Sequence, residues 1–442
     1  MFKKVMPLST ILFLRFLGLF LVLPVLSIYA LELEGATPFL VGVIVGGYAL
    51  TQAIFQVPFG SMSDKIGRKK TILIGLVIFI IGSLVAAYAT DIYTLMIGRF
   101  LQGAGAIGSV VTAMIADLVE EKQRGHAMAI MGGFIAMAFA FAMGLGPVIA
   151  SHFGVDTIFE ITAFLAFLAI VILFTKVPTP PKIKHIYHSK TSTKDILQNP
   201  NLLGMIIINA MQKGLMTAAF VIIPVILTNS EWGFGWEKSE LWKVYAPAMV
   251  IGLAAMGPAA VFGEKRNIPK QIFLVSIALF SISFIMMGTV QSDTLFVVAV
   301  ILFFIAFNMM EPLVQSMISK FAKVHQKGAA LGIANSVAYF MTFLGGTFAG
   351  LYLGVSSRET LGLTIGAIGI LWFIWTLVKM KNPLRYAHLV IEEEKVDDKK
   401  LSELEHEHIA EWFINETEKV VVIKYAVEKL SEDDLKAKVF KG

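Results

Sequence analysis

Twelve apolar segments of roughly twenty residues each dominate positions 1–380 of the chain. A helix of about 20 apolar residues is long enough to cross the hydrocarbon core of a bilayer, where a segment has to satisfy its own backbone hydrogen bonds. Charged residues make up 16% of the sequence, well below the roughly 25% that is usual in soluble domains. The pattern predicts an all-α membrane protein. The expected spans are Leu8–Ala30, Phe39–Met62, Thr71–Ala89, Tyr93–Ala116, Ala127–Ser151, Ile158–Val177, Leu202–Leu227, Leu241–Phe262, Gln271–Val290, Thr294–Ser319, Ala329–Gly354 and Leu361–Met380.

A polar stretch at residues 178–200 separates the sixth span from the seventh and predicts a cytoplasmic linker with room for a short surface helix. The segments on either side, residues 1–177 and 201–380, repeat each other at an offset of about 200 residues. The stretch R-G-H-A at 124–127 corresponds to K-G-A-A at 327–330. We therefore expect two pseudo-symmetric bundles of six helices.

Lysine and arginine are unevenly distributed between the two sets of predicted loops. The positive-inside rule assigns the richer set to the cytoplasm, so both termini are predicted to be cytoplasmic and the protein to be integral to the bacterial inner membrane. The net charge of +5 divides into −4 from Lys381 onward and +9 before it, and a basic membrane body fits cytoplasmic loops rather than nucleic acid. The inner set holds Lys65, Arg68, Lys69, Lys70, Lys122, Arg124, Lys265, Arg266, Lys270, Lys320, Lys323 and Lys327, and the outer set holds Lys238, Lys243 and Arg358.

The tail at residues 381–442 has the composition of a soluble segment and predicts a small cytoplasmic α+β appendage. Apolar residues recur at helical spacing from Leu401 to Phe413, which favours an amphipathic helix. Val420–Tyr425 is typical of a strand. Ser431, followed three residues later by Asp434, predicts the cap of a last short helix.

The loop between the second and third spans, Gly60–Lys70, reads G-S-M-S-D-K-I-G-R-K-K. Short loops on the positive side of any membrane protein collect Lys and Arg. That accounts for the cations but not for Asp64, which lies four residues after Gly60 and four before Arg68. The pattern G-x-x-x-D-(R/K)-x-G-R-(R/K)-(R/K) resembles the loop signature of the major facilitator superfamily, and every specified position matches. The resemblance implies the major facilitator fold, with a substrate site between the bundles near the midplane.

The resemblance also implies a conformational latch in and beside this loop. Asp64 is expected to face the N-terminal end of the eleventh span near Gly328, where unpaired backbone N–H groups and the helix dipole favour a carboxylate. Because the second and eleventh spans belong to opposite bundles, this contact should form only when the cytoplasmic side is closed. Arg68 is expected to pair with Asp117 at the end of the fourth span; the alternative is that both are solvated loop charges. The latch residues are Gly60, Asp64, Lys65, Gly67, Arg68 and Asp117.

The fourth span resembles a second motif of the family, reading L-x-x-x-R-x-x-Q-G-x-G-A at 95–106. An arginine in an apolar helix is costly and usually faces a wet cavity or a polar partner. Arg99, followed by Gln102, could favour the charged form of a neighbouring acid and so release its proton. The same stretch spells G-x-G-x-x-G at 103–108. No strand precedes it, so we interpret these glycines as sites of close helix packing rather than of dinucleotide binding.

Few other charges fall within the predicted spans, and Glu311 is the deepest of the acids. Burial disfavours the charged form of a carboxyl group, as a proton-coupling residue requires. The alternative is a structural ion pair between Glu311 and Lys213, whereas Glu160 lies close to the outer surface. The candidate proton-coupling or cavity residues are Arg15, Arg99, Gln102, Lys213, Asn308 and Glu311.

The fifth span carries A-x-x-x-G-P-x-x-A-S at 142–151. This is similar to the antiporter motif of the family, in which a Gly-Pro pair, here Gly146 and Pro147, bends the helix at the interface between the bundles. Several glycines of that motif are replaced by Ala142, Ala150 and Ser151, so small size is retained.

Three further stretches, at 15–26, 242–245 and 303–311, resemble the YajR-type branch of the drug:proton antiporter-like facilitators, which carries an appended ferredoxin-like domain. The tail here is shorter than that domain. We hypothesise a secondary active transporter that exports a small organic or amphipathic compound by alternating access, driven by protons. The alternatives are a sugar or metabolite permease of the same fold and a transport-deficient sensor or scaffold that acts through the tail.

An enzyme is not expected, because the sequence contains no Walker A motif, no G-x-S-x-G elbow and no zinc-type cluster. No cofactor and no metal are predicted. His406 and His408 lie in an E-H-E-H string, which is more typical of a solvated helix face than of a metal site. The expected partners are a small-molecule substrate, protons and the lipid bilayer, and nucleic acid is not among them.

Overall fold

The computed structural model of the protein describes residues 2–119, 121–178, 193–322, 326–380, 382, 386–392, 396, 409–415, 420–426 and 429–439. Within them, twelve helical segments are long and apolar enough to cross a membrane. This confirms the predicted number of spans. The helices are α1 (Phe2–Leu21), α2 (Leu23–Leu31), α3 (Pro38–Ile66), α4 (Arg68–Ala87), α5 (Ile92–Ala104), α6 (Gly108–Leu118), α7 (Glu121–Phe153), α8 (Val155–Thr175), α10 (Pro200–Thr228), η1 (Lys238–Glu240), α11 (Trp242–Lys265), α12 (Pro269–Thr289), α13 (Asp293–Phe321), α14 (Lys327–Val355) and α15 (Arg358–Lys379).

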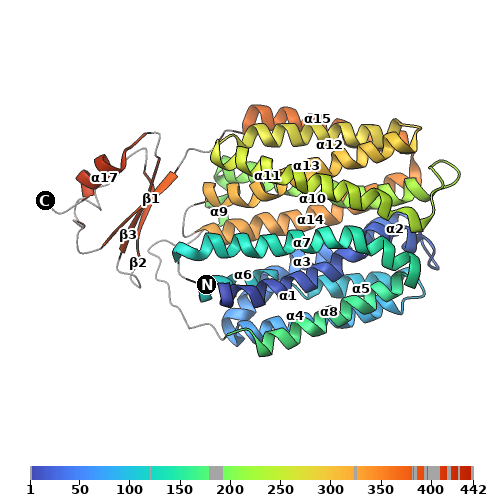
Figure 1. The fold of residues 1–442 in the computed structure, drawn as a ribbon, viewed down its shortest axis with the longest axis horizontal. Helices are drawn as coiled ribbons and strands as arrows, with labels where there is room; N and C mark the ends of the chain where they lie inside the picture. The colour runs from blue at the N-terminus through green and yellow to red at the C-terminus, as the bar shows by residue number, and fades with distance from the viewer. Residues whose placement is uncertain are drawn as a thin grey trace.

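The membrane helices run side by side, with α1–α8 in one bundle and α10–α15 in the other (Figure 1). This arrangement confirms the major facilitator fold. The tail sheet lies beyond the end of the bundles that carries the N-terminus (Figure 1). We call this end, which also carries the turn between α3 and α4, the tail-side end. The opposite end, with the loops at 32–37 and 229–237, is the far end.

Two of the spans are interrupted, although the apolar sequence continues through both of them. The first is interrupted at Val22, between α1 and α2, because Pro24 lacks an N–H and its ring clashes with the carbonyl one turn earlier. The fourth is interrupted between α5 and α6 at Gly105. A Cβ on Gly105 would lie 2.3 Å from the carbonyl oxygen of Gly75, so the break lets the backbone touch α4.

At the far end the two bundles meet through backbone contacts between α3 and α14. A Cβ on Gly42 would lie 2.2 Å from the carbonyl oxygen of Gly346, and one on Gly350 would lie 2.3 Å from that of Pro38. Such distances exclude any side chain at these positions. An ion pair between Lys238 and Glu32 also joins the bundles at this end.

The tail folds as a three-stranded antiparallel sheet, ordered β1-β3-β2, and a helix. The helix, α17 (Glu432–Val439), begins after Ser431, whose Oγ accepts a hydrogen bond from Asp434 N at 3.2 Å. The predicted strand and cap are confirmed. The predicted amphipathic helix was wrong for residues 409–413, which belong to β2, and its earlier part lies outside the described residues. The strands are β1 (Tyr386–Glu392), β2 (Ile409–Asn415) and β3 (Val420–Ala426).

The reason for this error lies in the pairing of β2. Residues of β2 such as Trp412 and Ile414 are large and favour strands, and β3 pairs with them in antiparallel register from Glu411 to Asn415. In the linker, a short helix α9 (Thr193–Gln198) precedes α10, as expected. The remainder of that prediction, at 179–192, lies outside the described residues.

Candidate functional site

The turn between α3 and α4 places the acid and base of the loop signature together. Gly67 has φ of 98°, a conformation that side chains other than glycine rarely adopt. This reversal brings Arg68 to the start of α4, where its Nε lies 3.1 Å from Asp117 Oδ2 and its Nη1 lies 2.6 Å from Asp64 Oδ1. All three charges therefore lie within the first bundle.

Among the described residues, no hydrogen bond or ion pair joins Asp64 to α14. Its side chain is 66% exposed, and no heavy atom lies within 4 Å of the Cβ position of Gly328 at the start of α14. Lys65, the next residue, is an exposed cation in the last turn of α3. The latch between Asp64 and α14 was expected only with the tail-side end closed, and it stays a prediction.

In the second bundle, Glu264 near the end of α11 occupies the position that Asp64 has near the end of α3. It also forms its hydrogen bonds within its own bundle. Its carboxylate accepts hydrogen bonds from Lys320 and Ser316 on α13. In each bundle, the acidic residue at the tail-side end of the second span, Asp64 or Glu264, is therefore bonded to a residue of the same bundle.

Arg99 on α5 is fully buried, and its partners are uncharged. Its Nη1 donates to Gln102 Oε1 at 2.7 Å, and its guanidinium lies over the ring of Tyr48, 4.9 Å from the centroid. Gln102 in turn donates to Ser83 Oγ at 3.0 Å. Arg99 thus has the polar partner expected of an intramembrane arginine, and does not face open space.

Arg15 on α1 is also fully buried. Its Nη2 donates to the carbonyl oxygen of Gly105 at 3.0 Å and to Gln52 Oε1 at 3.3 Å. The break after α5 supplies that carbonyl, because the helix stops at Ala104. The guanidinium also lies over the rings of Phe16 and Phe79, at 5.3 and 5.2 Å from their centroids.

In the second bundle, Lys213 on α10 and Glu311 on α13 form an ion pair with Nζ 2.7 Å from Oε2. Gln212 Nε2 donates to the same carboxylate oxygen at 3.0 Å. The lysine and glutamate side chains keep 22% and 33% of their surface exposed, although both lie near the middle of their helices. Asn308, by contrast, donates within α13 to the carbonyl oxygen of Phe304 at 2.9 Å. Glu160 lies exposed near the far end of α8.

Tyr339, near the middle of α14, links the two groups of polar residues. It belongs to the second bundle but packs against the buried cluster of the first, and its side chain lies close to Gln52 and Arg15 of the first bundle and to Glu311 of the second. Sequence reasoning missed Tyr339, Gln52 and Gln212. The two glutamines were detectable as polar residues within apolar spans, whereas nothing local to α14 indicates which bundle Tyr339 contacts.

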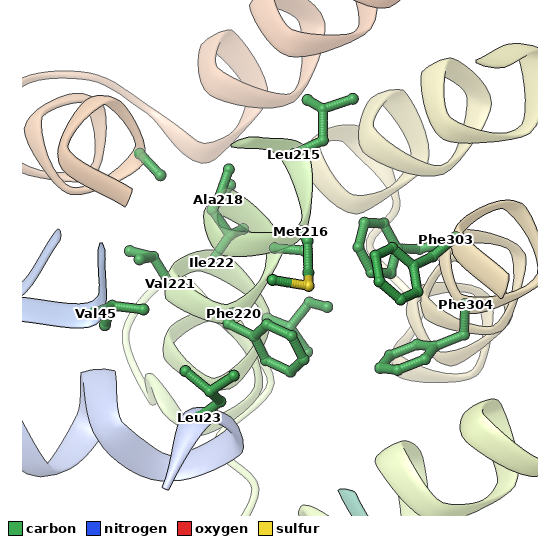
Figure 2. Close-up of a cluster of buried hydrophobic side chains, with 14 of the residues drawn as sticks. Leu23, Val45, Leu215, Met216, Ala218, Phe220, Val221, Ile222, Phe303 and Phe304 are labelled. Carbon is green, nitrogen blue, oxygen red and sulfur yellow. The ribbon is translucent and has the colours of Figure 1, made fainter. Parts of the chain in front are cut away.

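An aromatic cluster crosses between the bundles next to these polar residues. We call it the aromatic plug, and it consists of Phe20, Phe139, Phe220, Tyr245, Phe304 and Phe307. The Phe139 ring of the first bundle lies 5.6 Å from that of Phe307 and 6.1 Å from that of Phe220 in the second. Figure 2 shows Phe220 and Phe304 with Met216 in a buried apolar region that also receives Leu23 from α2. Along α1, α10 and α13, Phe20, Phe220 and Phe304 lie nearer the far end than the mid-helix polar residues of the same helices.

Toward the tail-side end the glycines are unpacked. Gly132 and Gly133 on α7, Gly257 on α11 and Gly332 on α14 have no heavy atom within 4 Å of their Cβ positions. The far-end glycines of α3 and α14, in contrast, touch backbone. The described glycines thus show backbone contact between the bundles at the far end, and open Cβ positions on α7, α11 and α14 nearer the tail-side end.

Gly146 and Pro147 lie within α7, which continues as a helix through both. A Cβ on Gly146 would lie 2.1 Å from the carbonyl oxygen of Leu21, at the break between α1 and α2. Gly146 thus packs against its own bundle. The neighbouring Gly144 faces the other one, with its Cβ position 4.0 Å from Ala246 Cβ on α11. The role of the pair as a bend at the interface stays a prediction.

In the described part of the chain, no group of three or more His, Asp or Glu side chains could hold a metal ion. His406 and His408 of the E-H-E-H string lie outside the described residues.

The sequence and the fold of the chain were compared with those of known proteins. The chain matches the Major Facilitator Superfamily over residues 8–346 and 248–421. It is 35% identical over 391 residues to the inner membrane transport protein YajR of Escherichia coli, covering 87% of this chain and 85% of that protein. Multidrug resistance protein 1 of Bacillus subtilis is 28% identical over 356 residues, covering 79% of this chain and 88% of that protein. Among solved structures, a D-xylose-proton symporter shares the fold at a TM-score of 0.67 and 17% identity, covering 86% of this chain and 99% of that one.

Proposed function

The chain belongs to the major facilitator superfamily, and from this we propose that it exports a small organic or amphipathic compound in exchange for protons. As a member of this family it is an integral membrane transporter and not an enzyme. The drug-resistance proteins among its relatives, such as the Bacillus subtilis protein, support efflux as the direction of transport. The orientation we propose has the tail-side end in the cytoplasm of a bacterial cell, at its inner membrane.

The observation that carries proton coupling is the pair of Lys213 and Glu311. In the described chain, Glu311 is the one carboxylate at the middle of a membrane helix that has a cationic partner. The side chains of Glu311 and Lys213 both remain partly exposed. Protonation of Glu311 would cancel its charge and release Lys213, which alters the electrostatics between α10 and α13. A proton can thereby favour one arrangement of the helices over another.

Alternating access follows from the asymmetry of the two ends. The α3–α14 glycine contact joins the bundles at the far end, whereas several glycines nearer the tail-side end have open Cβ positions; this supports a state that receives substrate from the cytoplasm. In the opposite state, the α3–α14 glycine contact would open and Asp64 would reach the start of α14. In that opposite state, the latch residues would hold the tail-side end closed while the far end is open.

Proteoliposomes with an imposed pH gradient and an internal pH-sensitive dye test this proposal. Addition of a transported compound should accelerate proton movement, and Glu311→Gln should abolish the acceleration because the amide cannot take up or release the proton. Glu160→Gln is the matched control, since Glu160 is exposed near the far end of α8.

Substrate movement without proton movement would instead favour a permease for a sugar or another metabolite. No movement of any compound, with the folded protein confirmed in the membrane, would favour a sensor that acts through the tail. Retention of coupling in Glu311→Gln would refute the assigned role of Glu311.

A further inference from the structure

We propose that Arg15 and Gln52 form a binding subsite for the anionic group of an organic substrate, such as a carboxylate or sulfonate. This deepens the proposed function, on which it rests, by assigning a charge class to the substrate.

The first bundle buries two guanidinium groups without a counter-charge. In the described chain, neither Arg15 nor Arg99 has a carboxylate oxygen within 4.0 Å, and both side chains are fully buried. Arginine keeps its charge in proteins, and a buried charge is normally paired. Glu311 is already neutralised by Lys213. The centre of the protein therefore carries an excess of positive charge.

The unsatisfied atoms around Arg15 are all hydrogen-bond donors. Within the described chain, Arg15 Nε and Nη1 have no hydrogen-bond partner, and the Gln52 side chain interacts with Tyr339 of the second bundle. The orientation of the Gln52 amide is fixed, because its Oε1 accepts from Arg15. The donors Nε and Nη1 of Arg15 lack a hydrogen-bond acceptor, and the guanidinium lacks a negative counter-charge. An oxyanion supplies both, because it carries a negative charge and several acceptor sites.

The second bundle shows the opposite imbalance at its centre. The orphan atoms of Asn209 and Gln212 are the acceptors Oδ1 and Oε1. Among the described residues, Arg15 has two unpartnered donor atoms, whereas Arg99 and Trp372 each have one. Arg99 is a weaker candidate than Arg15, because only its Nη2 is unpartnered.

The surroundings of Arg15 also indicate what the anionic group is attached to. Phe16 lies against the guanidinium and stacks on Phe20 at 5.4 Å, and Phe20 contacts Phe139 at 5.1 Å. A row of rings thus leads from the proposed subsite into the aromatic plug. The arrangement fits an anion that carries an aromatic or aliphatic body, rather than an inorganic ion.

Tyr339 is the lid of this subsite. It comes from α14 of the second bundle and packs on the first-bundle cluster near Arg15. Because α14 moves with the second bundle, separation of the bundles at mid-depth would withdraw Tyr339 and expose the free donors. In the present state Arg15 is covered.

Binding to the purified full-length protein in lipid nanodiscs, without a pH gradient, tests the proposal. The probes are matched pairs of an acid and its neutral amide: naphthoate and naphthamide, phenylbutanoate and phenylbutanamide, octanoate and octanamide. Calorimetric titration should show that at least one acid binds about tenfold or more tightly than its amide, as expected for hydrogen bonds to a charged group. Arg15→Gln should remove this preference, while Arg266→Gln, a surface cation at the C-terminal end of α11, should retain it.

Gln52→Met provides a second variant that keeps the guanidinium, and it should weaken the acid but not the amide. Equal affinities for every acid and its amide, an absence of binding by all the acids, or a preference that survives in folded Arg15→Gln would overturn the proposal. Failure here is distinguishable from failure of proton coupling. Neutral compounds that drive protons would leave the proposed function intact, whereas acids that bind without moving protons would leave the subsite intact.

Discussion

Lys424 of strand β3 donates a hydrogen bond to the backbone carbonyl of Lys320, at 3.0 Å, and so attaches the tail sheet to the last turn of α13. The lysine side chain is 6% exposed and also reaches the carbonyl oxygen of Ala322 at 3.4 Å. The last carbonyls of a helix lack intrahelical partners and attract cations. Lys4 makes the equivalent contact in the first bundle, at 3.5 Å from the carbonyl oxygen of Leu118 at the end of α6.

Replacement of this cation should loosen the tail. A hydrogen bond from a charged group is worth about 1.5–3 kcal/mol, so Lys424→Met should weaken docking of the sheet by roughly one to two orders of magnitude. Hydrogen exchange of the β3 amides and of the last turn of α13 should become faster. Lys436→Met is the control, because Lys436 pairs with Glu432 within α17 and not with the bundles. Unchanged exchange in Lys424→Met would show that other contacts hold the tail.

The far-end contact of α3 and α14 depends on the absence of side chains. Gly42→Ala should separate the helices, because the new Cβ would lie 2.2 Å from a backbone oxygen that cannot move aside. The far-end-open state should gain population. The chain contains no cysteine, so the labelling rate of a single cysteine introduced at the buried Val45 reports this opening directly.

Gly257→Ala is the matched control for that experiment. Its Cβ would enter open space, and a glycine-to-alanine change at a compatible site stabilises a protein by about 0.4–1 kcal/mol. Equal labelling of Val45→Cys in both backgrounds would contradict the assignment of the glycine contact as the far-end gate.

The proposed latch of Asp64 predicts that a substitution can also favour opening at the tail-side end. Asp64→Asn should weaken the tail-side-closed state, because an exposed or partly buried carboxylate at a helix N-terminus contributes about 0.3–2 kcal/mol. A cysteine introduced at Gly328 should then be labelled faster by a membrane-impermeant reagent, by up to roughly thirtyfold. Asp195→Asn on α9 changes the charge of the same end and should leave the rate unchanged. If both variants are labelled at the wild-type rate, Asp64 does not act as a latch.

The glycines of the G-x-G-x-x-G stretch should differ sharply in their tolerance of a methyl group. A Cβ on Gly103 would lie 1.8 Å from the carbonyl oxygen of Tyr48, whereas no heavy atom lies within 4 Å of that of Gly108. Gly103→Ala should lower the melting temperature strongly and Gly108→Ala should not. Similar melting temperatures would contradict the packing role of Gly103.

Much of this fold was accessible from the sequence, since the length and apolarity of each span are local properties. The breaks at Val22 and Gly105 were not predicted, because apolar residues continue through both of them. Pro24 was a signal for the first, whereas the second depends on the approach of Gly75 from another helix. The strand β2 was missed for a similar reason, as its partner β3 lies later in the chain.

The candidate site was accessible only in part. Charged residues such as Arg15, Lys213 and Glu311 stand out in apolar spans because their burial is costly. Which of them meet is decided by packing between helices that are distant in sequence. Tyr339 illustrates the limit, because its place over the first bundle depends on how the two bundles are docked.

The contact of Lys424 has a practical consequence for anyone who attaches a reporter to this protein. A fluorescent domain that replaces residues after Met380 would strip the end of α13 of its lysine, and the exposed carbonyls would have to be hydrated instead. A reporter joined behind Gly442 keeps β3 in the chain and leaves that end of the helix covered. The second design is therefore the one whose signals describe the native protein.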